Sequence, residues 1–434
     1  MTATATTGIK HEYGVWSPDI DAEVARQYGL GLGLSHLAAI TGKPRSALTR
    51  MLAGSGTPLR HRHARPDPEI VLWEADPVLL ALVLHEQDVI ARYRPPGGTG
   101  LGARVRGLVG RDTPRLMDRV ESLPAAQRAD AMLRLLIACP YAPGLATLDA
   151  LTRAGVAAAE QGDPQTAPAV YGWLALLHAT TGQWKQALHH STTENQLHLD
   201  LDGGVDALGD EVHAAVHARW RHAALLAAAG DHEAAVHVHT ALDLVLTTLA
   251  DIHERITTAR SLADGYTRAA LLRARARNHA ALGTQALCAH YVQTAVDALK
   301  DACDLFVHLQ VHLADPVLHP ILPMFERSMA LFALGYARSG QKTGTGRYEL
   351  QASAGFLMLI PALDEDLDRR GDDIVRRIRP VARGETEPFP PPPARLLLPR
   401  IHLTDTTRRL LDADVVRRVP CAPLATFPDL AALH

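Results

Sequence analysis

Four hydrogen-bonding side chains lie close together near the N-terminus, at positions that one side of a helix would share. They are Arg45, Ser46, Thr49 and Arg50. Residues three or four apart on a helix are neighbours, so two guanidinium groups and two hydroxyls would form one polar surface. Guanidinium groups bind phosphate oxygens and guanine edges, and hydroxyls bind phosphates or bases. This surface therefore offers the chemistry of binding an anionic partner rich in hydrogen-bond acceptors.

The neighbouring residues predict the helix that positions this surface. Leu48, Met51 and Leu52 recur at the spacing of a buried helical side. Pro44 suits the first turn of a helix, and Gly42 can adopt the positive φ that a tight inter-helix turn requires. The third of three short helices is therefore expected to begin near Pro44.

Two further helices are predicted before this one. The first runs to about Tyr28 after a cap at Asp19 or Asp21, and the glycines of "YGLGLGLS" end it. Ser35 is expected to cap the second, which ends at the Thr-Gly-Lys turn. Its inward-facing residues are predicted to be Leu37, Ala38 and Ile40.

Acidic residues are absent from the whole stretch between Glu23 and Asp67. Arginine abundance by itself says little, because 39 arginines and only five lysines are typical of GC-rich coding. The acid-free stretch nevertheless carries a charge of +7, whereas the rest of the chain sums to −10. Its basic residues are Arg26, Lys43, Arg45, Arg50, Arg60, Arg62 and Arg65. A small positive module on an acidic body is typical of nucleic-acid binding.

The basic segment "GSGTPLRHRHARP" follows the third helix. Its glycines and proline cannot continue that helix, and Arg60 and Arg62 are suited to follow a phosphate backbone or enter a narrow minor groove. A solvated basic linker is the alternative interpretation.

The segment from Tyr28 to Arg62 resembles the compact three-helix helix-turn-helix of bacterial regulators and recombinase-type DNA-binding domains, including a small actinobacterial type. The matching residues are Tyr28, Gly33, Leu34, Ser35, Leu37, Ala38, Thr41, Gly42, Arg50, Leu52, Gly56, Pro58, Leu59, Arg60 and Arg62. The sequence departs from that pattern at Pro44, where Ser is common, and in the "GLGLG" linker.

The resemblance implies that the third helix enters the major groove. The expected DNA-binding residues are Lys43, Arg45, Ser46, Thr49, Arg50, Arg60 and Arg62. Similar helical layouts also serve as dimerisation units without DNA activity, so that alternative stays open.

The rest of the chain predicts helix after helix and therefore an all-α fold. Helices are expected from Asp76 to the breaker "PPGG", and over about 101–121, 124–138 and 144–161. A looser repeat follows, in which Gly182, Gly230 and Gly283 each mark a helix-helix turn. A small residue lies five positions after each glycine, at Ala187, Ala235 and Cys288. "AAAGDHEAA" is its clearest fragment, and the pattern resembles a degenerate tetratricopeptide superhelix, with "MALFALGYARSG" as a weaker fourth unit.

Four regions are predicted from these patterns. They are a helix-turn-helix with its basic arm over 1–65, a helical connecting region over 66–145, a tetratricopeptide-like domain over 146–380, and a proline-rich linker with a C-terminal tail over 381–434.

Two features of the repeat region allow more than one interpretation. Arginines recur densely, and a solvated helix face is favoured over a site that holds a carboxylate. They are Arg219, Arg221, Arg273, Arg275 and Arg277. His213 and His217 have the spacing of zinc ligands, with Glu211 and His222 nearby, but "HEAAVH" is one residue too long for a zinc-protease motif. No metal site is expected, with zinc on this pair as the alternative.

No enzyme activity, catalytic residue or cofactor is predicted, because phosphate-binding glycine loops and a nucleophile elbow are missing from the sequence. Four scattered cysteines, no signal peptide and no long apolar run favour a cytoplasmic protein, associated with the nucleoid if it binds DNA.

The sequence as a whole favours a sequence-specific DNA-binding transcriptional regulator that binds double-stranded DNA as a homodimer. Its repeat domain would mediate dimerisation or sense a peptide, protein or small effector in a concave groove. The alternative is a tetratricopeptide-type adaptor that recruits a protein while the basic module holds it to plasmid, phage or chromosome-end DNA.

Overall fold

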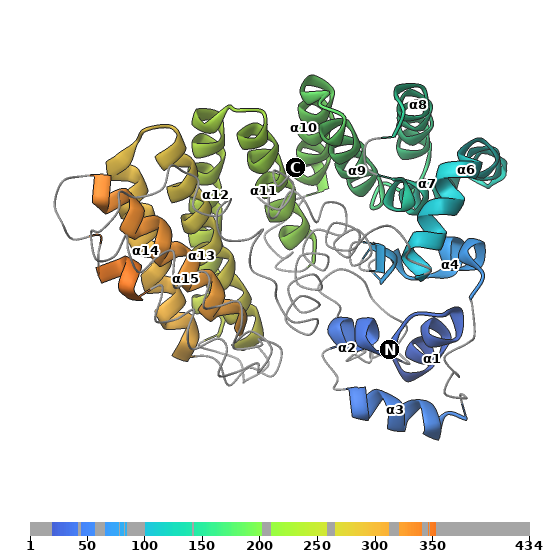
Figure 1. Ribbon diagram of the computed structural model, residues 1–434, viewed down its shortest axis with the longest axis horizontal. Helices are drawn as coiled ribbons and strands as arrows, with labels where there is room; N and C mark the ends of the chain where they lie inside the picture. The colour runs from blue at the N-terminus through green and yellow to red at the C-terminus, as the bar shows by residue number, and fades with distance from the viewer. Residues whose placement is uncertain are drawn as a thin grey trace. The chain divides into compact units, whose positions relative to one another are not determined.

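The computed structural model of the chain describes residues 20–41, 45–56, 66–77, 79–81, 83–84, 100–140, 143–201, 210–257, 265–311, 321–340, 346 and 348–352. All regular structure in these ranges is α-helical, and they contain no strand (Figure 1). The predicted all-α class is confirmed. None of the described helices has the combination of length and apolar composition needed to cross a bilayer.

The chain divides into two compact units, and the division falls between Arg221 and His222, inside helix α11 (Asp210–Ala228). The first unit contains the N-terminal helices and the helices up to α10. The second contains α12 to α15. The limits predicted at residues 65, 145 and 380 stay predictions.

Three short helices form the N-terminal head: α1 (Ile20–Leu30), α2 (Leu34–Thr41) and α3 (Arg45–Gly54). Gly31 adopts a φ of 117° between α1 and α2, a value that glycine reaches without strain. The helices enclose a small apolar core, whose buried residues are Val24, Tyr28, Leu32, Leu37, Leu48 and Leu52. Leu48 and Leu52 give α3 the inward side expected from its sequence.

Five helices come between the head and α10 in the described part of the first unit. They are α4 (Pro68–Glu74), α6 (Leu101–Ser122), α7 (Ala125–Ala138), α8 (Leu145–Gln161) and α9 (Ala167–Thr180). The bounds of α6, α7 and α8 confirm the predicted helices, and Asp76 caps the segment after α4 through its carboxylate and the Leu79 N–H, 3.1 Å apart. A kink at Asp112 in α6 precedes Pro114, which lacks the N–H that would continue the helix ladder. Residues 171–178 of α9 are all buried, so α9 is central to this unit.

Three helix-helix turns share one hydrogen-bonding pattern. α9 turns into α10 (Trp184–Leu201), α11 into α12 (His232–Thr257), and α13 (Gly265–Cys288) into α14 (Val292–Val311). In each, an N–H beyond the helix end donates to a carbonyl five residues earlier, from Gln183 to His178, Asp231 to Leu226 and Tyr291 to Ala286. This is the Schellman arrangement, which requires one residue with positive φ.

That residue is Gly182 in the first turn, Gly230 in the second and His290, with a φ of 63°, in the third. The prediction that Gly283 marks the third turn is wrong. Gly283 lies inside α13, where an added Cβ would overlap the Leu299 side chain of α14, so it permits close helix packing instead. The small residue five positions after the turn is accordingly Ala295, not Cys288.

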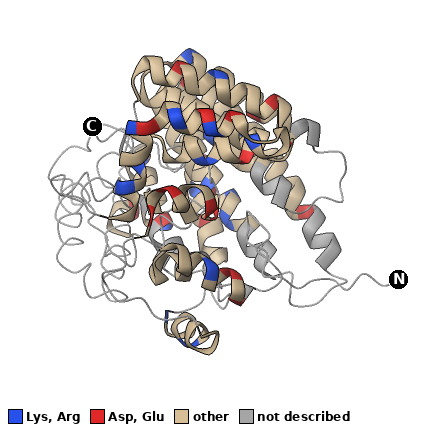
Figure 2. Cartoon of the chain, turned by 90° about the vertical axis from the view of Figure 1, so that its right-hand side faces the viewer, with Lys and Arg blue, Asp and Glu red and all other residues tan. Residues whose placement is uncertain are grey.

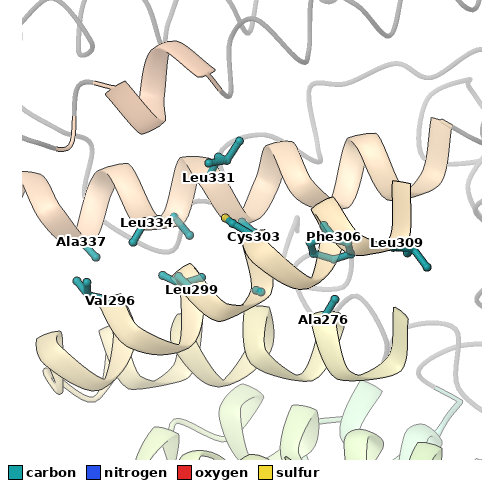
Figure 3. Close-up of a cluster of buried hydrophobic side chains, with 12 residues drawn as sticks. Ala276, Val296, Leu299, Cys303, Phe306, Leu309, Leu331, Leu334 and Ala337 are labelled. Carbon is teal, nitrogen blue, oxygen red and sulfur yellow. The ribbon is translucent and has the colours of Figure 1, made fainter. Parts of the chain in front are cut away.

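The second unit stacks α12, α13, α14 and α15 (Ile321–Gly340), each packed against the next. Its main core lies between α13, α14 and α15, with Phe306 of α14 fully buried among them (Figure 3). Leu299 and Leu309 of the same helix are also fully buried there.

Candidate nucleic-acid interface

The structure places four of the predicted DNA-binding residues together on α3. Arg45, Ser46 and Arg50 are exposed, and Thr49 is half-buried. The Thr49 hydroxyl donates to the Arg45 carbonyl at 2.9 Å, and the Arg50 Nε donates to the Ser46 carbonyl at 3.4 Å. The Thr49 oxygen thus remains an acceptor, and most N–H groups of both guanidinium groups have no acceptor among the described residues.

The charge of α3 is not compensated within the described part of the chain. Neither Arg45 nor Arg50 forms an ion pair there, and α3 contains no acidic residue. Figure 2 shows this helix lowest in the view, with basic residues in blue and none of the acidic red that accompanies them on the helices above. Two exposed arginines on a helix without acids attract a polyanion.

Lys43, Arg60 and Arg62, the other predicted DNA-binding residues, lie outside the described residues. Their assignment stays a prediction from the sequence.

Arg26 does not belong to the positive surface, although it contributes to the charge of the acid-free stretch. Its Nη2 lies 2.7 Å from Oε1 of Glu23, and its Nε donates to Oε2 at 2.9 Å. The hydrogen bond with Arg26 lowers the pKa of Glu23, and Glu23 in turn raises that of Arg26. Arg26 also donates to the carbonyl of Glu74 at 3.1 Å. Its role is therefore structural, which residue counting alone could not reveal.

The prediction of a solvated helix face is wrong for three of the five arginines of the repeat region, because Arg221, Arg273 and Arg277 are buried. Arg221 is buried and donates through both Nε and Nη2 to the carboxylate of Glu194, with 3.0 Å between Nε and Oε2. Gly172 makes room for this pair, because a Cβ there would lie 2.6 Å from Oε1 of Glu194. Arg221 therefore already binds a carboxylate of its own chain, and the alternative, that these arginines hold the carboxylate of a bound molecule, stays a prediction.

The second unit buries a similar arrangement with two arginines. Arg273 donates to both carboxylate oxygens of Glu326, at 2.8 and 2.9 Å. Arg277 lies 3.1 Å from the same carboxylate, and all three side chains are less than one-tenth exposed. No sequence signal indicated this pairing, because Glu326 lies about 50 residues further along the chain in α15.

Several histidines of the body are internal packing residues. His190 stacks on His178 with ring centroids 5.1 Å apart, and burial lowers the pKa of His190 to about 4. His239 lies 2.9 Å from the Asn278 amide oxygen, and burial likewise lowers its pKa to about 4.

The residues proposed for a metal site do not assemble one in the described ranges. No three His, Cys, Asp or Glu side chains gather there in a way that could hold an ion. His217 packs edge-on against Trp220, and the side chain of His213 lies outside the described residues. In the "HEAAVH" stretch, His232 contacts Gln285 at 2.9 Å and Glu233 accepts a hydrogen bond from Tyr291 at 2.8 Å.

Comparisons with known proteins do not place the chain in a family. No family model matches the sequence, and no curated protein matches it. The solved structure of BtubC (BKLC) from P. vanneervenii aligns with 76% of this chain and 96% of its own chain, at 13% identity and a TM-score of 0.30. A similarity at that level indicates neither a shared activity nor a shared partner.

Proposed function

We propose that the protein is a sequence-specific DNA-binding transcriptional regulator. In this proposal the head of α1, α2 and α3 binds double-stranded DNA, with α3 in the major groove. The helical-repeat body mediates dimerisation, senses a peptide or small effector, or does both.

The observation that carries the proposal is the uncompensated positive surface of α3. Arg45 and Arg50 are held outward because Leu48 and Leu52 bury the opposite side of the same helix. Elsewhere in the described first unit, several arginines are paired with carboxylates of the chain; Arg115 and Arg119, for example, both contact Glu69. Arg45 and Arg50 have no such carboxylate among the described residues, so α3 offers a surface suited to phosphate.

Each residue then has a distinct role. Arg45 and Arg50 contact guanine edges or phosphates, and Ser46 donates to a base or phosphate. Thr49 serves as an acceptor, since its hydroxyl proton is bonded to the backbone. Lys43 positions the turn on phosphate, and Arg60 and Arg62 follow the backbone or enter the minor groove.

The proposal is tested by selecting genomic fragments with the purified full-length chain and footprinting the enriched fragments. Enrichment of one recurring motif, with a protected site of two half-sites, is the expected result. Capture of fragments without a shared motif would contradict it and would favour the adaptor tethered to DNA. No retention of DNA at low salt would exclude both, because non-specific phosphate contacts are strongest there.

A further inference from the structure

Helix α4 lies between the head and the helices of the first unit that follow it. It packs against α1 on one side and against α6 and α7 on the other. Its last carbonyls, like those of any helix, have no partner within the helix and require donors from elsewhere. The residues that supply those donors come from both neighbours.

The head supplies two contacts to the end of α4. Arg26 of α1 donates from Nη1 to the carbonyl of Glu74 at 3.1 Å. Gln27, which is fully buried, accepts from the N–H of Asp76 at 3.1 Å and donates to Glu23 at 2.7 Å. A buried glutamine with partners on both sides of a contact fixes one arrangement, because any shift would leave polar groups without partners.

The following helices supply the opposing contacts. Arg134 of α7 donates to the carbonyl of Ala75, a fully buried residue. Closer to the start of α4, Glu69 accepts from Arg115 at 2.9 Å and from Arg119 at 3.0 Å. Arg119 also lies over the Trp73 ring, 5.0 Å from its centroid, which is a cation–π distance.

We propose that Glu74, Ala75 and Asp76 form a junction that locks the orientation of the head against α6 and α7. Glu74 and Asp76 are hydrogen-bonded to α1 on one side, and Ala75 between them is hydrogen-bonded to α7 on the other. Arg26 and Gln27 are the positioning residues on the head side, and Arg134 is the positioning residue on the body side.

The junction leaves the α3 surface free. In Figure 1, α3 lies on the side of the head away from α4, so the contacts at Glu74–Asp76 do not cover Arg45 or Arg50. On the proposed function, movement of α6 and α7 would therefore turn α3 as part of one rigid body and change the separation of two heads in a dimer.

Spin labels at Ala53 of α3 and Ala157 of α8 measure this rigidity by pulsed electron resonance, because both residues are exposed. Cys288 and Cys421 are replaced by Ser so that only the introduced sites react, while Cys139 and Cys303 are buried. The native junction is expected to give one narrow distance distribution. Arg26→Ala combined with Gln27→Ala should broaden it roughly twofold or more, as a local opening does.

Matched variants separate the junction from general damage. Arg134→Ala removes the body-side contact and is expected to broaden the distribution as well. Asp130→Ala removes only the ion pair that Arg134 makes at 2.8 Å within α7, and should leave the distribution narrow. A second label pair, Ala22 with Ala53, lies within the head and must keep its distance if the head remains folded.

A broad distribution in the unaltered protein would overturn the junction, as would a narrow one in the Arg26→Ala/Gln27→Ala variant. If Asp130→Ala broadened the distance distribution as much as Arg134→Ala does, the hydrogen bond from Arg134 to the Ala75 carbonyl would not be what holds the head. These distances are measured without DNA, so failure of DNA binding leaves the result unaffected. Conversely, the junction variants are expected to bind a single half-site with unchanged affinity, because α3 is intact.

Discussion

The head and the helical body use the same residue type in opposite ways. On α3 of the head, Arg45 and Arg50 are exposed and have no carboxylate partner in the described chain. In the body, Arg221 and Arg273 are almost fully buried, and each is bound by a carboxylate of the chain itself. The position of acidic residues in the fold, more than the arginine content, decides whether a guanidinium group is neutralised inside the protein or stays exposed without a carboxylate.

The largest effect is expected from breaking a body pair. Glu194→Ala leaves the guanidinium group of Arg221 buried without its carboxylate and should lower the free energy of unfolding by about 3–5 kcal/mol. Replacing both partners, with Glu194→Leu and Arg221→Met, should cost much less, because no buried charge remains. All five tryptophans, from Trp16 to Trp220, precede His222, so fluorescence during urea unfolding reports the first unit.

The second unit provides the matched control for that measurement. Glu326→Ala removes the carboxylate that binds Arg273 and Arg277. It should lower the urea midpoint of the loss of helix seen by circular dichroism, while the midpoint of the tryptophan transition stays unchanged. If Glu194→Ala left the urea midpoint of the tryptophan transition unchanged, burial of Arg221 would not require the Glu194 carboxylate. The contrast with the exposed arginines of the head would then be lost.

The head side is tested by removing its two exposed arginines. Arg45→Ala with Arg50→Ala should leave the fold intact and weaken DNA binding by at least about 2 kcal/mol, or roughly 30-fold, since each arginine contact contributes about 1–3 kcal/mol. Titration by fluorescence anisotropy at several salt concentrations measures both the affinity and its salt dependence. The slope of log affinity against log salt should fall by roughly one for each arginine that contacts phosphate.

Arg111→Ala with Arg153→Ala removes the same charge from exposed positions of α6 and α8 and serves as the control. Equal loss in both double variants would mean that net charge alone drives binding. An unchanged affinity after loss of Arg45 and Arg50 would remove α3 from the interface.

The buried histidines give the body a pH dependence that the exposed arginines of the head cannot have. His190 has a pKa of about 4 when folded and about 6.5 when unfolded, because burial disfavours its charged form. Its contribution to stability is therefore full above pH 6.5 and is lost as the pH falls toward 4. At pH 5 this loss amounts to about 2 kcal/mol.

Urea unfolding followed by tryptophan fluorescence between pH 7 and 5 tests this dependence. His190→Gln should make the fall in stability shallower by up to one proton. His239→Gln, in the second unit, should leave the tryptophan transition as steep as before. An unchanged pH dependence in the His190 variant would show that this imidazole is solvated rather than buried.

Local patterns predicted the helices well, because helix bounds follow from nearby residues. Asp76 caps the segment it was expected to cap, and Leu48 and Leu52 face inward as their spacing required. Pairings between distant residues were not predictable, because nothing near Arg221 or Arg273 in the sequence points to Glu194 or Glu326. The junction at Glu74–Asp76 had no sequence signal for the same reason: two of its three bonds are backbone carbonyls accepting from remote arginines.

The Gly283 error shows how one residue type can serve two structural needs. Glycine suits a turn with positive φ, and it equally suits a close approach of two helices. A single sequence does not distinguish these uses, since both place glycine among small and apolar residues. In the third turn, the positive-φ position is filled by His290, which is not a glycine but is one of the few other residue types enriched in that conformation.

The smallest effect is expected at His290. Its replacement measures how much the positive φ in the turn between α13 and α14 costs the folded protein. A non-glycine residue in the left-handed region costs about 1 kcal/mol, so His290→Gly should stabilise the second unit by up to that amount. The gain is reduced by the greater freedom of glycine in the unfolded chain. Gly230→Ala imposes the opposite change at the equivalent turn and should destabilise by about as much, and thermal unfolding by circular dichroism compares them. If His290→Gly destabilised the protein instead, the positive φ of His290 would cost less than the freedom that glycine adds to the unfolded chain and any contact of the imidazole contribute together.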